Sequence, residues 1–125
     1  MALKIRVKQT KPGLVTLFPV GSIDSDGSEI AEKEIKRLLA EPIVTLVLDM
    51  TGVAYISSVG VGLMAKTKAL LNRQGADLAM INLQPQISKV FEIMRLLPTL
   101  NVFESVQELD EYLNKVQQRI LDEGE

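Results

Sequence analysis

The chain contains no cysteine and no histidine among its 125 residues. These two absences remove thiolate nucleophiles, imidazole bases and the usual zinc ligands together. Most familiar enzyme mechanisms are therefore excluded. The sequence predicts no catalytic residue, no metal site and no cofactor, and it leaves carboxylate, lysine and hydroxyl chemistry or binding alone.

An excess of basic residues is also missing. The 14 Lys and Arg residues are balanced by 16 Asp and Glu residues, for a net charge of −2. Direct binding of nucleic acid is not expected, because no field of positive charge would attract a phosphate backbone. No stretch reaches the roughly 20 apolar residues that span a bilayer, and the first residues lack the apolar run of a signal peptide. We expect a soluble, cytoplasmic protein with no membrane insertion.

The length and composition suit one domain. A chain of 125 residues with 46% hydrophobic content can bury one α/β core but not two. No internal repeat and no linker is present. We expect residues 1–121 to form the domain and residues 122–125 to be a short acidic tail.

Hydrophobic periodicity predicts the elements of the first half. Residues 3–9 alternate apolar and basic side chains, and a turn at residues 11–13 leads to a second strand over residues 14–20, so the two strands should form a hairpin. Asp26 is expected to cap the helix that follows. The nearly uninterrupted apolar run over residues 43–48 predicts a strand buried on both faces at the centre of the sheet.

In the second half, helices and strands alternate. A helical pattern opens at Ser57 and Ser58, with Ser58 at or next to the N-cap, and it stops at Gly75. The whole pattern predicts an α/β fold with a mixed sheet of about four or five strands and about four helices largely on one face. The remaining elements are expected to be a strand over residues 78–83, a helix from Pro85 to Pro98, a short strand near residues 102–103 and a helix opened by a capping box at residues 105–108.

Residues 49–63, DMTGVAYISSVGVGL, resemble the signature of the STAS-domain family, specifically its bacterial anti-sigma factor antagonists. In that family a buried strand ends in Asp, a short loop containing Ser or Thr follows, and a turn Asp-Ser-Ser/Thr-Gly-Leu-Gly opens a helix. The expected element order β-β-α-β-α-β-α-β-α is also similar to the family's fold. The resemblance therefore extends from the first strand to about Val116.

This resemblance implies a phosphorylation site at Ser58. The family's phosphorylated serine directly follows the Asp and precedes the first glycine of Gly-x-Gly by two residues, which is the position of Ser58. Ser57 stands where the family usually has Asp, and this makes it a rival acceptor, while Val59 stands where the family usually has Ser or Thr. As a residue type, Ser58 also suits a plain helix cap, which does not exclude phosphorylation.

The implied partner-binding surface surrounds that turn. Asp24 matches a position after the second strand where family members often carry an Asp, although a turn aspartate is an equally good interpretation. The residues that the resemblance assigns to partner binding are Asp24, Ser57, Ser58, Val59, Gly60, Val61 and Gly62.

By the same resemblance, the partner is an anti-sigma factor that is also an ATP-dependent serine kinase. The unphosphorylated protein would bind this kinase and free a sigma factor. Phosphorylation would end binding, and a PP2C-type phosphatase would restore it. The alternative is a STAS-like scaffold in a stressosome or a transporter-associated complex, with the same fold and no sigma factor.

Two nucleotide-binding patterns compete for the same glycines. Residues 60–65 satisfy Gly-x-Gly-x-x-Gly/Ala, and residues 60–67 nearly form a P-loop ending in Lys66 and Thr67. A dinucleotide site needs an acidic residue at the end of the next strand, where Asn82 stands, and the P-loop lacks its second glycine. A small nucleotide-binding protein is therefore the weaker interpretation.

Overall fold

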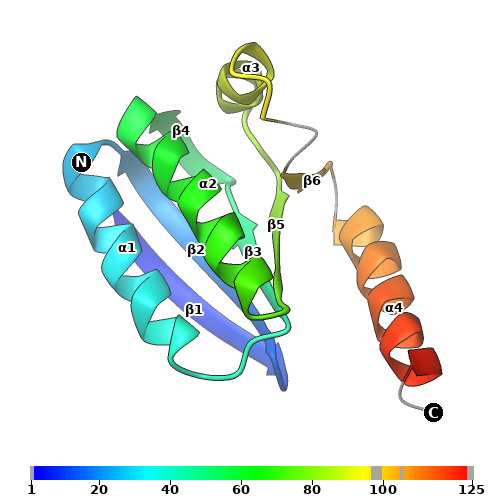
Figure 1. Cartoon of the computed structure of the whole chain (residues 1–125). Coiled ribbons are helices and arrows are strands. Elements are labelled where there is room, and N and C mark those ends of the chain that lie inside the picture. The colour runs from blue at the N-terminus through cyan, green and yellow to red at the C-terminus, as the bar shows by residue number, and fades with distance from the viewer. Residues whose placement is uncertain (1, 97–99, 105, 124–125) are drawn as a thin grey trace.

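The computed structural model describes residues 2–96, 100–104 and 106–123. It contains six strands and four helices (Figure 1). In chain order they are β1 (Lys4–Lys11), β2 (Leu14–Ile23), α1 (Ser25–Leu39), β3 (Thr45–Asp49), β4 (Gly52–Ile56), α2 (Ser58–Arg73), β5 (Asp77–Ile81), α3 (Pro85–Ile93), β6 (Asn101–Phe103) and α4 (Val106–Glu123).

The sheet is mixed, with the strand order β1-β2-β3-β5-β6. β1 and β2 form the expected antiparallel hairpin, and all other pairings are parallel. β2 is long enough to pair with two strands in succession: residues 14–17 pair with β3 and residues 20–23 pair with β4. β4 thus continues the sheet beyond the end of β3.

β3 lies at the centre of the sheet and is buried on both faces, as its apolar sequence predicts. Successive strand residues point to opposite faces. Leu46 and Leu48 therefore belong to a core cluster with α1 and α2, whereas Val47 belongs to a second cluster with Ala79 and Ile81. Two cores, one on each side of the sheet, hold the domain together.

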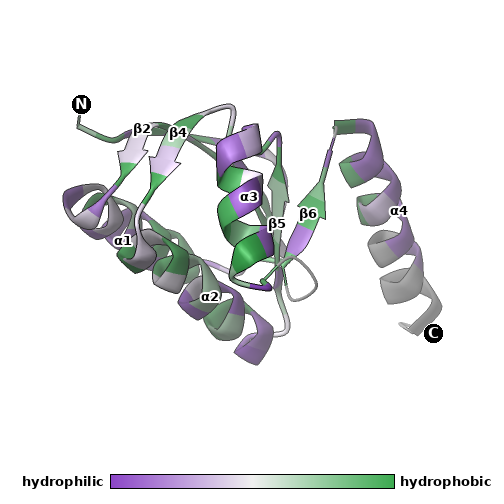
Figure 2. Cartoon of the chain, turned by 90° about the horizontal axis from the view of Figure 1, so that it is seen from above, coloured by the Kyte–Doolittle hydropathy of each residue, from purple (hydrophilic) through white to green (hydrophobic). Residues whose placement is uncertain are grey.

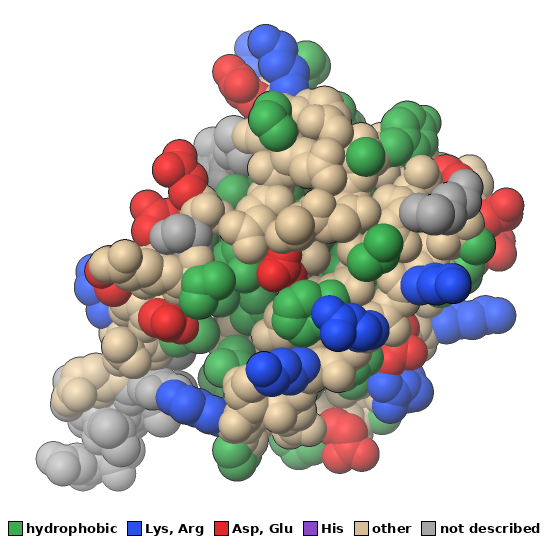
Figure 3. Space-filling model, turned by 180° about the vertical axis from the view of Figure 1, so that it is seen from behind, with side chains coloured by type: hydrophobic (Ala, Val, Ile, Leu, Met, Phe, Trp, Pro, Cys, Tyr) green, Lys and Arg blue, Asp and Glu red, His purple; other side chains and the backbone are tan. Residues whose placement is uncertain are grey.

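The helices cover the two faces unequally. α1 and α2 lie side by side over one face, and α3 lies beside β4 with Ile87 and Phe91 in the same core (Figures 1 and 2). α4 packs against the opposite face, which we call the back face, through Leu109. Figure 3 views this back face, where Thr16 and Phe18 of β2 and Val47 of β3 contribute side chains.

Asp77 at the start of β5 ties α4 to the sheet. Its carboxylate accepts hydrogen bonds from the Tyr112 hydroxyl and the Asn101 side-chain amide. The Lys68 ammonium of α2 approaches the other carboxylate oxygen at 3.3 Å. The Tyr112 ring also packs on Phe103, with ring centroids 5.0 Å apart. One half-buried carboxylate therefore connects the helices of both faces.

The sequence predicts this α/β fold correctly, with some differences in detail. The segment before Ser57 forms the strand β4. The fourth helix lies on the face opposite the first two. The first helix begins at Ser25 and is capped by Asp24 rather than by Asp26, because the Asp24 carboxylate accepts from the Gly27 N–H.

Some expectations fall at or beyond the limits of the described residues. α4 runs to Glu123, so Asp122 and Glu123 of the expected tail are helical, while residues 124–125 are outside the described part. The third helix ends at Ile93 and not at the expected Pro98, because the chain turns out of the helix at Met94 and Arg95, where φ is 58° at Arg95. Pro98 itself and Ser105, the expected cap of the fourth helix, lie outside the described residues. Among the described residues, no helix is long and apolar enough to cross a membrane.

Candidate functional site

The candidate site forms where β2 and β4 end together. These parallel strands are in register at their last residues, Ile23 and Ile56. Each strand then leads directly into a helix, α1 after Asp24 and α2 after Ser57. The Ser57 N–H donates to the Ile23 carbonyl at 2.9 Å, which fixes the two junctions next to each other. Two helix N-termini therefore lie side by side at one end of the sheet, where their partial positive charges add.

Ser57 is the N-cap of α2. Its backbone is extended, with φ −87° and ψ 171°, and its Oγ accepts a hydrogen bond from the Gly60 N–H at 3.2 Å. The same hydroxyl donates to the Ile23 carbonyl at 3.2 Å. Since both the donor and the acceptor capacity of this half-buried hydroxyl are used, Ser57 fits a structural role.

Ser58 is the first residue of α2 and lies on the surface. It is next to the cap rather than the cap itself. Val59 is also exposed, with 54% of its surface accessible. The first turn of α2 contains no acidic residue. A hydroxyl at this position is accessible from solvent and lies at the positive end of the helix dipole.

The other residues of the glycine turn differ in exposure. Gly60 is buried, and a Cβ atom added there would lie 2.7 Å from both the Ile23 carbonyl oxygen and an Ile56 side-chain carbon. Val61 is 2% exposed and belongs to the core. Gly62 is exposed, and a Cβ atom added there would meet nothing within 4 Å beyond its chain neighbours and the backbone of its own helix. Ser58, Val59 and Gly62 therefore form the accessible part of the turn, while Gly60 and Val61 support it from below.

Asp24 has a clear structural task. Its Oδ1 accepts from the Gly27 N–H at 2.8 Å and caps α1. It directly follows Ile23, whose carbonyl holds Ser57, so it also lies at the same end of the sheet as the glycine turn. The two interpretations that the sequence leaves open for Asp24 are thus compatible.

The residues that a P-loop would need are engaged elsewhere. The Lys66 ammonium forms an ion pair with Glu32 of α1 at 2.9 Å. The Thr67 hydroxyl is buried and donates to the Leu63 carbonyl at 2.7 Å. The Gly60 N–H is occupied by the Ser57 hydroxyl. Because none of these groups is placed to cradle a phosphate chain, the geometry does not support the nucleotide-binding interpretations.

The ion pair between the two helices changes the ionisation of Glu32. The hydrogen bond from Lys66, followed by the positive charge of Lys36, lowers the pKa of the Glu32 carboxyl. Lys36 lies one turn along α1 at 3.6 Å. This exposed cluster links α1 to α2 below the candidate site.

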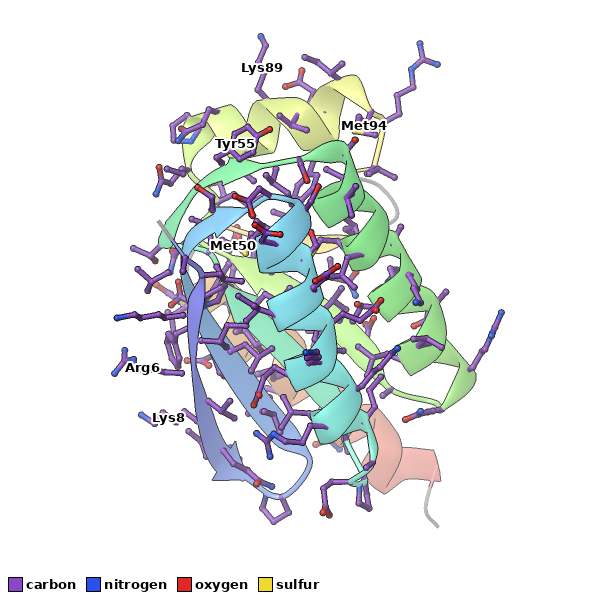
Figure 4. The ribbon with its side chains drawn as sticks, turned by 90° about the vertical axis from the view of Figure 1, so that its left-hand side faces the viewer. Arg6, Lys8, Met50, Tyr55, Lys89 and Met94 are labelled. Carbon is purple, nitrogen blue, oxygen red and sulfur yellow. The ribbon has the colours of Figure 1, made fainter. Side chains whose placement is uncertain are left out.

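Sequence reasoning missed Tyr55 as a surface residue of the site. Tyr55 lies in β4, three residues before Ser58, and is 54% exposed. Figure 4 shows it next to α3, which carries Lys89 and is followed by the half-exposed Met94. The side chains of Gln84 and Gln86 donate from the start of α3 to the β4 region, at the carbonyls of Thr51 and Ala54. The sequence signal that could have placed Tyr55 in a strand is the apolar run 53–56, but this run is too short to predict a strand by itself.

The chain belongs to the STAS domain family, whose family model matches residues 6–109. This confirms the resemblance found in the sequence. The anti-sigma-B factor antagonists of Listeria monocytogenes and Listeria innocua are each 23% identical to it over 93 residues, which cover 74% of this chain and 82% of theirs.

Solved structures of anti-sigma factor antagonists share this fold. One from Mycobacterium paratuberculosis is 21% identical, with a TM-score of 0.78 over 93% of this chain and 95% of that one. Unphosphorylated SpoIIAA is 18% identical, with a TM-score of 0.73 over 89% of this chain and 97% of that one. SpoIIAA has also been solved in its phosphorylated form.

Proposed function

We propose that this protein is an anti-sigma factor antagonist controlled by phosphorylation of Ser58. In its unphosphorylated form it binds an anti-sigma factor that is also a serine kinase, and a sigma factor is released in the cytoplasm. Phosphorylation ends this binding, and a PP2C-type phosphatase restores it. The observation that carries the proposal is the division of labour between two adjacent serines: Ser57 caps α2, whereas Ser58 is exposed.

The exposed side chains around Ser58 suit a docking surface. Val59 and Tyr55 are each 54% exposed, so a partner that covers Ser58 also removes apolar surface from water. Asp24 and Ser57 hold this surface through the caps that they form, and Gly60 and Val61 support it from the core. Gly62 adds a surface without a side chain, which allows close approach.

Phosphorylation at this position changes binding more than folding. A phosphate carries about −1.5 to −2 charges near neutral pH, and the N-terminus of a helix stabilises such a charge. At a docked interface the same charge must lose its water, and it has no compensating group unless the partner supplies one. The expected switch therefore acts by weakening the complex.

The protein takes part in the reaction as a substrate and supplies no catalytic group. The Ser58 Oγ forms a bond to the γ-phosphorus of ATP held by the kinase, the bond from that phosphorus to the departing ADP breaks, and the hydroxyl proton passes to a base of the kinase. An exposed hydroxyl at the first residue of a helix can reach such a site without unfolding.

The test is phosphorylation by the cognate kinase with ATP, followed by mass spectrometry. We expect a single phosphate, lost in Ser58→Ala. The matched variant is Ser57→Asp, which removes the rival hydroxyl but keeps a residue that caps helices well. Labelling should persist in Ser57→Asp.

Unchanged labelling of Ser58→Ala, with loss in Ser57→Asp, would assign the acceptor to Ser57. If the wild-type chain neither accepted phosphate from the kinase nor bound it, the proposed phosphorylation switch would be wrong. The alternative function, a scaffold in a stressosome or a transporter-associated complex, would then be favoured.

A further inference from the structure

The back face of the sheet is only half covered. α4 packs over β5 and β6, where Leu109 meets Ala79 and Ile81. Between α4 and β1 the face forms an open groove of about 320 Å³. Its floor includes the apolar Leu14 and Phe18 together with the polar Thr16 and, from β3, Val47 and Asp49, and no described helix lies above it.

The two sides of this groove carry opposite charge. On the β1 side, Lys4, Arg6 and Lys8 are exposed at alternating positions, and they share one face of the strand. Figure 4 shows Arg6 and Lys8 pointing away from α1, and the Arg6 guanidinium lies 5.3 Å from the centre of the Phe18 ring. The groove is therefore basic along its β1 edge.

On the opposite side, α4 carries exposed acidic residues, Asp110 and Glu111 among them. Lys8 and Asp110 both line the groove, from its two sides. In Figure 3 acidic side chains are frequent on the α4 side and basic side chains on the β1 side, while hydrophobic side chains and an acidic one lie between them. The back face thus has a positive half that is bare and a negative half that protrudes.

From this arrangement we propose that the groove binds a second copy of this chain, in a symmetric dimer joined through the two back faces. A twofold axis that lies in the interface and runs parallel to the strands places β1 of each copy opposite α4 of the other. Each protruding acidic helix then enters the bare basic half of its partner, and the floors of the two grooves meet between them.

The charge pattern selects both the occupant and the orientation. A twofold axis perpendicular to the strands would place β1 against β1 and α4 against α4, so that like charges would repel. An acidic partner helix of another protein would match the basic edge but would face the acidic α4 with the same sign. Only a surface that repeats both charges in reverse order satisfies both edges, and the chain itself carries such a surface.

The test is the oligomeric state of the full chain, measured by sedimentation equilibrium and light scattering. We expect a dimer whose dissociation constant rises with salt, because the charged edges remain near water and are screened. Two charge reversals, Arg6→Glu with Lys8→Glu and Asp110→Lys with Glu111→Lys, should each weaken the dimer at least tenfold. These side chains are exposed, so the variants should keep the wild-type circular dichroism spectrum.

Mixing the two reversed variants provides the decisive measurement. Each variant alone should be monomeric, and the mixture should form a heterodimer. At one β1–α4 contact the negative β1 edge of one variant then faces the positive α4 of the other, and at the second contact both surfaces keep their original, opposite charges. The matched control is Lys33→Glu with Arg73→Glu, two exposed residues of α1 and α2 on the other side of the sheet, and it should dimerise normally.

A chain that stayed monomeric at low salt over the whole concentration range would overturn the proposal. A dimer that survived both reversals would do the same, since it would use another surface. Should one reversed variant fail to fold, the other variant and the salt dependence of the wild-type chain still decide the question.

Discussion

The backbone of Gly60 lies directly against Ile23, so closely that a Cβ atom at Gly60 would come within 2.7 Å of the Ile23 carbonyl oxygen. That same carbonyl accepts from the N–H and the hydroxyl of Ser57. We expect Gly60→Ala to lower the free energy of unfolding by about 1–3 kcal/mol, because either the carbonyl or the start of α2 must move. Urea denaturation followed by circular dichroism measures this change.

Gly62→Ala is the matched control for that measurement. Gly62 lies in the same helix with open space around it. Alanine there should raise stability by about 0.5–1 kcal/mol, because glycine in a helix has the larger entropy to lose on folding. Equal effects of the two substitutions would show that the contact with Ile23 does not constrain residue 60.

The two serines should differ in their effect on stability, as we propose that they differ in phosphorylation. Ser57→Ala removes the cap of α2 and should reduce the free energy of unfolding by about 1 kcal/mol. Ser58→Ala changes an exposed side chain and should stay within about 0.5 kcal/mol of the wild type. Thermal and urea unfolding of both variants measure the difference, and the reverse order would contradict the assignment of the cap.

A negative charge at Ser58 should affect binding and folding differently. We expect Ser58→Asp to weaken binding of the kinase at least tenfold, which is about 1.4 kcal/mol, while the melting temperature changes by only a few degrees. Titration calorimetry and a melting curve on the same variant measure both quantities. If the affinity for the kinase were unchanged and α2 melted, repulsion at the interface would be the wrong mechanism, and an order–disorder switch would be the better one.

The attachment of α4 depends on the Tyr112 hydroxyl, which donates to Asp77. Tyr112→Phe keeps the ring on Phe103 but removes this bond to a carboxylate, and it should destabilise the domain by about 1–2 kcal/mol. Amide hydrogen exchange should show faster opening in α4 than in α2. Tyr55→Phe, at a side chain that is 54% exposed, should leave both measurements unchanged.

Local sequence patterns predict most elements of this fold, and the differences arise from contacts distant in sequence. The pattern of residues 53–56 is too short and irregular to identify as a strand. These residues form β4 because they pair with the second half of β2, which is distant in the sequence. The amphipathic pattern of α4 shows that one side is buried but not which face of the sheet buries it. Asp24 and Asp26 are equally good caps as residue types. In the structure the Gly27 N–H donates to Asp24, which is therefore the cap.

The candidate site was predictable in its residues but not in their division of tasks. The motif places Ser57 and Ser58 at the start of a helix, where either serine could cap it. The choice follows from the Ile23 carbonyl, 34 residues earlier in the chain, which holds the Ser57 hydroxyl. Gly60 and Gly62 likewise look equivalent in the sequence, and only the neighbouring strand end makes one of them tight and the other open.

The glutamine side chains of α3 have a consequence for how the sheet ends. The Gln84 and Gln86 amides bind the carbonyls of Thr51 and Ala54, in and beside a strand that pairs only with β2 among the described strands. Free carbonyls on such a border invite hydrogen bonding from a foreign chain. By occupying them with its own amides, the chain protects itself against unwanted strand addition and the aggregation that follows from it.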